Sequence, residues 1–274
     1  MSEEKTILVC GVGEEASAAA RRLFGDGHAV VLYRASAPQF LRRRMCFADA
    51  WYDGYAYLDG VEARRADVSS EFLLGLRTRQ FIPLLRGLFS DAAGRWPWDA
   101  IVIAQEEKEP LPPSLRHLAD LTIGLGSHFH AGVDCDLVIG TDGLDPGAIL
   151  RQGDLPSPHH ARAAPRRSEE ILVCAPTAGQ FRTSSSIGAF VERNELLGAI
   201  DGVEIRAPHA GRIRGIARQK CAVIVGAPLV EIVSSPTARC AGVSDRSQLI
   251  SRGVSFAVEM EYLGLSPLPV GNWW

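Results

Sequence analysis

Short apolar runs recur through the first half of the chain, each bounded by glycine, proline or charged residues. Continuous apolar runs of this length are typical of β-strands buried on both faces. They lie at Ile7–Cys10, Ala29–Tyr33, Phe81–Leu85, Ala100–Ala104, Leu121–Leu125 and Leu137–Ile139. Between the first two runs, apolar residues recur at helical spacing from Ala16 to Leu23. This alternation predicts a Rossmann-like α/β domain with a mostly parallel sheet over residues 1–150.

The segments between these strands give further predictions. Tyr55–Leu58 and Val61–Arg64 flank Asp59-Gly60, which predicts a hairpin with a primed turn. We expect a helix around Glu71–Leu76 and another that opens at Pro38 and carries Arg42, Arg43 and Arg44. Three adjacent arginines cannot share one helix face, so at most two would hold an anion, and we interpret them as a solvated basic turn.

The second half contains an internal repeat. Residues 173–181 recur 32 residues later as residues 205–213, each copy with the phrase Ala-Pro-x-x-Gly. The register continues without a gap, pairing Val191 with Val223, Leu197 with Leu229 and Ile200 with Ile232. Neither copy can bury its apolar face alone, so we predict two copies intertwined around one core over residues 169–240.

The repeated phrase resembles the half-motif of biotinyl and lipoyl carrier domains, which have the barrel-sandwich hybrid fold. Those domains carry their prosthetic group on a lysine in a hairpin turn. The turn between the two halves here is Asp201-Gly202, which has no lysine. We therefore interpret this small all-β domain as a docking or packing module.

Two further segments complete the predicted organisation. Residues 151–168 are polar, rich in proline and without an apolar period, which is typical of an interdomain linker. Residues 241–274 contain a helix with Ser244 as its N-cap, followed by a tail that ends in two tryptophans.

Composition and charge restrict the function. The net charge is −3 and the pI is near 6.2, so no basic field draws the chain to nucleic acid or to a membrane surface. No apolar run is long enough to cross a bilayer, and the first residues do not resemble a signal peptide. We expect a cytoplasmic protein. Its six cysteines are scattered without a C-x-x-C pair, which argues against a disulfide framework or a four-cysteine zinc site.

A glycine-rich turn follows the first strand. Gly11 and Gly13 belong to a G-x-G-x-x-A phrase between a strand and a helix, the context in which a dinucleotide phosphate lies on a helix N-terminus. Glu14 and Glu15 would repel such a phosphate. Arg34 follows the second strand and is suited to the 2′-phosphate of NADP, or is simply a solvated charge. These features favour another phosphate-bearing ligand over NADP.

Reactive side chains gather in the loop between Leu125 and Leu137. The candidate ligand-binding residues here are Gly124, Gly126, Ser127 and Asp134, and the candidate metal ligands are His128, His130 and Cys135. Ligands bind at the carboxyl edge of open α/β sheets, and imidazole with thiolate suits a soft metal such as Cu(I). The alternative is a solvated loop whose cysteine is an inert buried thiol.

With these motifs in place, the chain resembles the selenium-dependent molybdenum hydroxylase maturation proteins, which are similar in role to the xanthine dehydrogenase accessory proteins. The resemblance covers the glycine turn at 11–16, the stretch Arg43–Gly54, and the segment Ile123–Gly126 continued by Phe129 and by Ala131–Asp134. The sequence departs from the family where Ser127-His128 replaces Pro-Gly, where His130 replaces threonine, and over residues 140–145.

The resemblance implies an accessory factor for a molybdenum hydroxylase. Such a factor would bind the molybdopterin dinucleotide cofactor or the immature enzyme, with a sulfur- or selenium-donating enzyme as a further partner. Cys135 would be the candidate chalcogen carrier, since a nearby cationic histidine lowers a thiol pKa. The alternatives are an NADP-dependent oxidoreductase and a non-catalytic docking scaffold. The sequence leaves open the client, the delivered atom, the oligomeric state and whether any reaction is catalysed.

Overall fold

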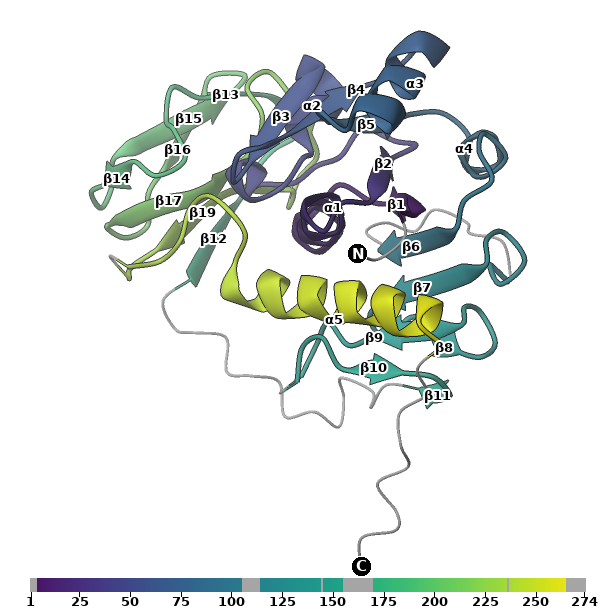
Figure 1. Cartoon of the computed structure of the whole chain (residues 1–274). Coiled ribbons are helices and arrows are strands. Elements are labelled where there is room, and N and C mark those ends of the chain that lie inside the picture. The colour runs from purple at the N-terminus through teal and green to yellow at the C-terminus, as the bar shows by residue number, and fades with distance from the viewer. Residues whose placement is uncertain (1–3, 105–113, 144, 155–169, 236, 265–274) are drawn as a thin grey trace, which may run out of the picture.

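The computed structural model describes residues 4–104, 114–143, 145–154, 170–235 and 237–264 (Figure 1). Most of the predicted linker and the tail with its two tryptophans lie outside the described residues. Within them, no helix has the length and apolar character needed to cross a membrane.

A nine-stranded sheet forms the centre of the first part of the chain. Its order is β10-β9-β7-β6-β1-β2-β5-β4-β3. The strands are β1 (Thr6–Cys10), β2 (Ala29–Tyr33), β3 (Tyr55–Leu58), β4 (Val61–Arg65), β5 (Ile82–Leu85), β6 (Ala100–Ala104), β7 (Leu121–Leu125), β9 (Leu137–Ile139) and β10 (Ile149–Leu150). Only the outermost strands β3 and β10 pair antiparallel within it. The predicted mostly parallel α/β sheet is therefore confirmed, as is the hairpin at Asp59-Gly60, where both residues have positive φ.

Helices cover both faces of this sheet. The longer ones are α1 (Glu14–Gly25), α3 (Ser69–Thr78) and α5 (Asp245–Tyr262), and the short ones are α2 (Asp49–Asp53), α4 (Phe89–Ala93) and the 3₁₀ turn η1 (Arg43–Met45). The apolar sides of α1 and α5 share one core cluster, and those of α3 and α4 share the other. The helix predicted to open at Pro38 is wrong, because residues 38–42 are irregular and only a 3₁₀ turn follows.

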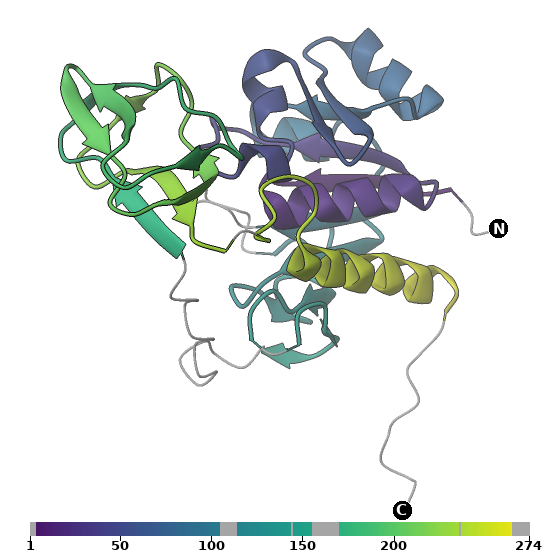
Figure 2. The ribbon, with the colours of Figure 1, turned by 90° about the vertical axis from the view of Figure 1, so that its left-hand side faces the viewer.

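Helix α5 returns from the end of the chain to lie alongside α1 (Figure 2). Small residues allow close packing on both helices: Ala16, Ala19 and Ala20 on α1 are buried, and Gly253 of α5 packs against the loop between β9 and β10, where a Cβ on it would collide with the carbonyl oxygen of Gly147. The Ser255 hydroxyl also donates to Asp26, just beyond the end of α1. The two helices run parallel, so both begin at the same end of the molecule.

Two four-stranded antiparallel sheets form the second part of the chain. Their strands are β12 (Glu170–Cys174), β13 (Gly179–Arg182), β14 (Phe190–Val191), β15 (Leu196–Ile200), β16 (Val203–Arg206), β17 (Gly211–Ile216), β18 (Ala222–Val223) and β19 (Pro228–Val233). A two-stranded sheet of β8 (His130–Ala131) and β11 (Gly153–Asp154) lies apart from them.

The strand orders confirm the predicted repeat. One sheet has the order β12-β19-β17-β14 and the other β16-β15-β13-β18, so each combines two strands from each half of the repeat. Replacing every strand by its counterpart 32 residues away turns the first order into the second. Phe181, Leu197, Ile213 and Leu229, four counterpart positions, are all buried in the shared core. We call residues 170–233 the repeat domain.

Candidate functional site

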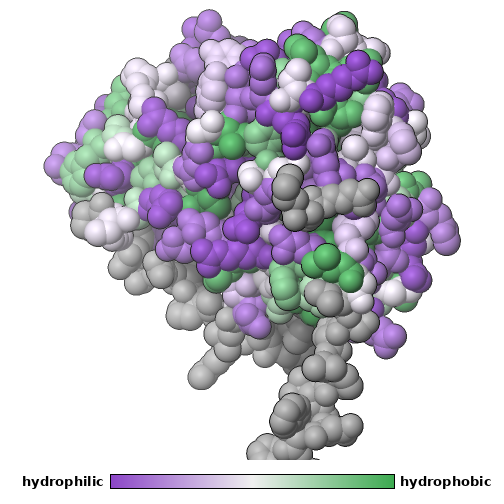
Figure 3. Space-filling view, in the orientation of Figure 1, coloured by the Kyte–Doolittle hydropathy of each residue, from purple (hydrophilic) through white to green (hydrophobic). Residues whose placement is uncertain are grey.

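A cleft of about 1120 Å³ lies between the carboxyl edge of the large sheet and the repeat domain. Its lining comes from the ends of β6 and β7, from the segments that follow β1, β2, β7 and β9, from the repeat domain and the residues after it, and from the first turn of α5. The cleft is therefore at the carboxyl edge of the sheet. It lies next to the point between β1 and β6 where the strand order reverses, which is where open α/β sheets bind ligands. In Figure 3 hydrophilic residues predominate over the first turns of α5 and the adjoining part of the repeat domain.

The glycine turn after β1 positions the start of α1 at the cleft. Gly11 has a φ of 129°, a conformation that favours glycine, and its N–H donates to the carbonyl of Tyr33. Gly13 is the N-cap of α1 and lines the cleft. The first turn of α5, from Ser244 to Ser247, lines it as well. Two parallel helix N-termini, each with its positive dipole end, thus meet at one cavity.

The turn after β7 is the second glycine-dependent feature. Gly124 has no room for a side chain, because a Cβ there would collide with the ring of Phe129. Gly126 has a φ of 96°, and a Cβ on it would lie 3.0 Å from the Thr141 hydroxyl oxygen. Close packing of this turn brings Gly126 and His128 to the cleft.

A network of buried and half-buried charges closes the cleft on the side of the repeat domain. The Arg42 guanidinium donates to both carboxylate oxygens of Glu231, each at 2.6 Å, and to Glu14 at 3.3 Å. Arg214 donates to Glu170 at 2.6 Å and lies 3.7 Å from Glu231. The residues of this network come from α1, from the segment after β2 and from strands β12, β17 and β19, so it joins the repeat domain to the start of α1.

A second set of charges lies between α1 and α5. Arg246 donates to the Asp142 carboxylate at 2.7 Å and to the carbonyl of Thr141. The carboxylate of Glu15 is 4.0 Å from the same guanidinium. Burial raises the pKa of Glu14 and of Glu15, and nearby arginines lower it only in part. The two carboxylates thus lie partly desolvated at the start of α1, beside arginines that offset their charge.

The predicted site residues divide between the cleft and other parts of the structure. Gly13, Gly126 and His128 line the cleft; Gly11 and Gly124 shape the turns beside it.

Arg34 and Asp134 have local partners instead of a place in the cleft. Arg34 is buried, its Nε donates to the carbonyl of Ser36, and it does not line the cleft, so a 2′-phosphate there would not meet it. The Asp134 carboxylate accepts from the backbone and ring nitrogens of His130, both at 2.8 Å. Ser127, half-buried, is also absent from the lining.

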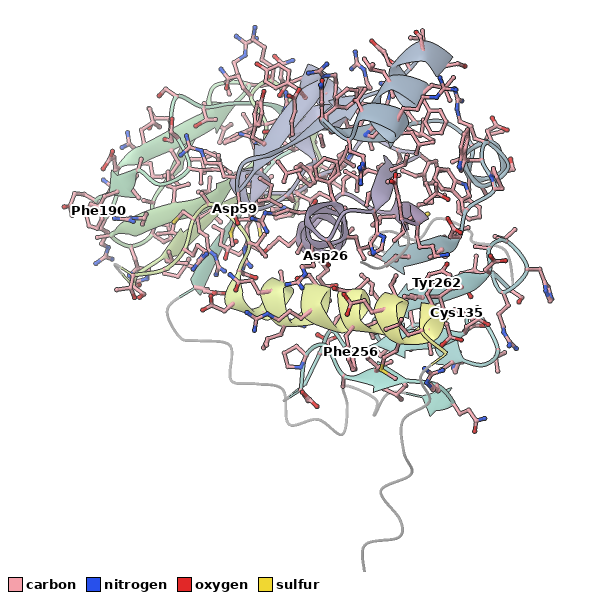
Figure 4. All side chains as sticks on the ribbon, in the orientation of Figure 1. Asp26, Asp59, Cys135, Phe190, Phe256 and Tyr262 are labelled. Carbon is pink, nitrogen blue, oxygen red and sulfur yellow. The ribbon has the colours of Figure 1, made fainter. Side chains whose placement is uncertain are left out.

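Cys135 is on the other side of the molecule from the cleft. Because β7 and β9 are parallel, their connection must cross from the carboxyl edge of the sheet to its amino edge, and Cys135 lies at the end of that crossing. Its thiol is buried, donates to the carbonyl of Leu137, and has a pKa raised by burial to about 11 (Figure 4). This corrects the expectation of an activated thiolate, and the carrier role is not part of the function proposed below.

The copper site expected from His128, His130 and Cys135 does not form either. His128 faces the cleft, His130 pairs with Asp134, and Cys135 is buried in an apolar cluster. Among the described residues no group of three histidine, cysteine or acidic side chains is placed to hold a metal.

The arginine triplet is part of the interdomain joint, which corrects the expectation of a solvated turn. Arg42 enters the charge network, Arg43 donates to the carbonyl of Ile216, and Arg44 donates to the carbonyl of Ile187. From the repeat domain, Arg218 pairs with both Asp49 and Asp53. The 3₁₀ turn η1 and the irregular residue before it direct the three arginine side chains to three different contacts.

Sequence reasoning missed the residues that come from distant parts of the chain. Arg214 and Glu231 lie on strands of the repeat domain, and Arg246 lies on α5. Each looks like an ordinary surface charge in sequence. The one signal was that Glu231 interrupts the continuous apolar run Leu229–Val233, a stretch that is buried throughout and where a charge requires a partner.

Comparison with known proteins gives a relative at 30% sequence identity. No family model matches the chain. An uncharacterized protein, YqeB of Escherichia coli strain K12, is 30% identical over 265 residues, covering 94% of this chain and 48% of that protein. The chain thus spans about half the length of the curated relative it matches.

One solved structure is also similar over a short segment. It is a single-chain, multi-domain long-chain acyl-CoA carboxylase, with 22% identity over 26% of this chain and 8% of that chain. The TM-score is 0.23, too low to support any statement about fold or function.

Proposed function

We propose that the chain is an accessory factor for a molybdenum hydroxylase and that it binds the molybdopterin dinucleotide cofactor in the cleft. The observation that carries the proposal is the meeting of two helix N-termini with the glycine turns of Gly13 and Gly126 at one cavity. Backbone N–H groups and helix dipoles at such a place suit a phosphate group. The volume, about 1120 Å³, slightly exceeds that of ordinary ligand pockets, which suits a ligand as large as a dinucleotide.

The sequence resemblance supports the choice of this ligand. The segments that resemble the maturation proteins include the glycine turn at 11–16 and the segment 123–126, and both border the cleft. A third, Arg43–Gly54, forms the joint that closes it. These three segments thus border the cavity that the proposal assigns to the cofactor, whereas the resembling residues Phe129 and Ala131–Asp134 lie outside its lining.

The repeat domain has a supporting role in this proposal. Its two interlocked halves fit the barrel-sandwich hybrid of carrier domains, while the hairpin at Asp201-Gly202 has no lysine to acylate. We propose that it closes the cleft and docks the immature hydroxylase, with residues 4–154 and α5 as the cofactor-binding part. A sulfur- or selenium-donating enzyme would act on the bound cofactor.

The NADP-dependent oxidoreductase remains the second candidate. The strand–glycine turn–helix arrangement favours it, but the position of Arg34 outside the cleft removes the expected contact to the 2′-phosphate. Parallel binding measurements therefore separate the two.

The test is anaerobic titration calorimetry of the full chain with molybdopterin dinucleotide and, separately, with NADPH. We expect the pterin dinucleotide to bind and Arg246→Ala to weaken it at least several-fold, because Arg246 holds the loop after β9 at the cleft. Arg252→Ala, an exposed position on the same helix, is the matched control. Binding of NADPH in preference to the pterin dinucleotide would overturn the proposal.

A further inference from the structure

The lining of the cleft is not explained by a phosphate alone. Its acidic residues are Glu14, Glu15, Asp142, Glu170, Glu231 and Asp245, and its arginines are Arg42, Arg214, Arg239 and Arg246. Carboxylates outnumber guanidiniums, so a ligand with only negative charge would meet an excess of like charge. A ligand that fits this cleft must also present hydrogen-bond donors.

Nearly all of these carboxylates already have a cationic partner. Glu14, Glu170 and Glu231 pair with Arg42 or Arg214; Asp142 pairs with Arg246; Asp245 lies 3.6 Å from Arg239. Their oxygens are engaged in holding the cleft together. These groups shape the site without needing a ligand.

Glu15 differs from them. Among the described residues none donates a hydrogen bond to its carboxylate, and the closest cation, Arg246, is 4.0 Å away, beyond hydrogen-bonding distance. The side chain is 35% exposed, on the second residue of α1, and faces the cavity. Burial also raises its pKa. The carboxylate is therefore partly desolvated and available to a ligand.

The shape of a carboxylate selects among donors. Its two oxygens lie in one plane and accept two parallel N–H groups best. A 2-amino-4-oxo pyrimidine edge, as in pterin or guanine, offers such a pair: the exocyclic amino group and the adjacent ring N–H. Adenine and cytosine place a ring acceptor beside the amino group and would leave one oxygen unpaired.

We infer that Glu15 recognises the 2-amino-4-oxo edge of a ring bound beside Ala104, Leu125 and Gly126. Ala104 ends β6, Leu125 ends β7 and Gly126 follows it, and all three small or apolar residues line the cleft. The inference rests on the proposed function, which brings a pterin into this cleft. It adds the residue that distinguishes such a ring from other heterocycles.

The experiment compares ligands that differ by the amino group alone. The full chain is titrated with pterin and lumazine, in which an oxo group replaces the 2-amino group, and with GDP and IDP. We expect pterin to bind about 10- to 100-fold more tightly than lumazine. If the chain also prefers GDP over IDP, the site accepts the 2-amino-4-oxo edge of either a pterin or a guanine. If it shows a preference only between pterin and lumazine, the site is specific for pterin.

Variants assign the effect to one side chain. Glu15→Gln should remove the preference for pterin, and Glu259→Gln, an exposed change of equal charge on α5, should leave it intact. Equal binding of pterin and lumazine by the unaltered chain would overturn the inference, even if Glu15→Gln failed to fold. So would a preference that survives Glu15→Gln.

The outcome is separable from that of the proposed function. If molybdopterin dinucleotide binds while pterin and lumazine bind equally, Glu15 does not recognise the 2-amino-4-oxo edge, and the proposed function stands. If pterin is preferred over lumazine but molybdopterin dinucleotide does not bind, Glu15 does recognise the ring edge and the proposed function is wrong.

Discussion

The two sides of the cleft are built in different ways. The side formed by the large sheet consists of glycine turns and helix N-termini, whose geometry is set by local backbone at Gly13 and Gly126. The opposite side consists of charged side chains from the repeat domain, held by Arg42 and Arg214. The first side is a property of the α/β part alone. The second exists only while the repeat domain is docked, so the complete cleft depends on ion pairs that cross the joint.

The largest expected effect follows from removing Arg42. In Arg42→Ala, the nearly buried carboxylate of Glu231 loses its bidentate partner, and a buried uncompensated charge is costly. We expect the free energy of unfolding to fall by about 2–4 kcal/mol, measured by urea denaturation. Arg252→Ala should change it by less than about 0.5 kcal/mol. Equal stability of the two variants would mean that the network does not hold the joint.

The next effect concerns the close packing that brings α5 to the sheet side. In Gly253→Ala, the new methyl group collides with the backbone of Gly147, and we expect a loss of about 1–3 kcal/mol in the same measurement. Gly25→Ala, at the end of α1 with open space around it, is the control and should not destabilise the protein. If Gly253→Ala leaves the free energy of unfolding unchanged, α5 does not pack closely against Gly147.

Cys135 tests whether the cleft, and not the rest of the α/β part, binds the ligand. It lies in the α/β part of the protein but outside the lining of the cleft. In Cys135→Ala, we expect a stability loss of about 1 kcal/mol from a small internal cavity and unchanged binding of molybdopterin dinucleotide. Burial and a pKa raised to about 11 should also make its thiol react with a disulfide reagent far more slowly than exposed Cys174. Rapid modification of Cys135 in the folded protein would restore it as a candidate carrier.

The smallest effect is a pH dependence on the sheet side. The pKa values of Glu14 and Glu15 are raised above their ordinary value of 4.5, so the folded state binds more protons than the unfolded state above that pH. Their contribution to stability therefore declines as pH rises from 4.5 through the folded pKa values. Glu15→Gln should flatten this decline in unfolding measurements between pH 4.5 and 7. A steeper decline in the variant would reverse the assigned sign.

The sheet and the repeat were predictable because their signals are local. Apolar runs placed β1, β2, β6, β7 and β9, and the 32-residue offset placed the interlocked halves. The cleft was only half predictable: Gly13 and Gly126 lie in local turns, whereas Arg214, Glu231 and Arg246 reach it through long-range packing. The prediction for Cys135 was wrong because it placed all residues between β7 and β9 at the carboxyl edge of the sheet. The two strands are parallel, so the segment that joins them must cross to the amino edge before β9 begins.

Hydrogen exchange of the full chain with and without molybdopterin dinucleotide tests the central claim most directly, since it reports where the ligand lies. We predict slower exchange of backbone amides at 13–15, at 125, 126 and 128, and at 244–247, the three segments that meet at the cleft. Binding without protection of these segments, or protection confined to the loop around Cys135, would contradict the account.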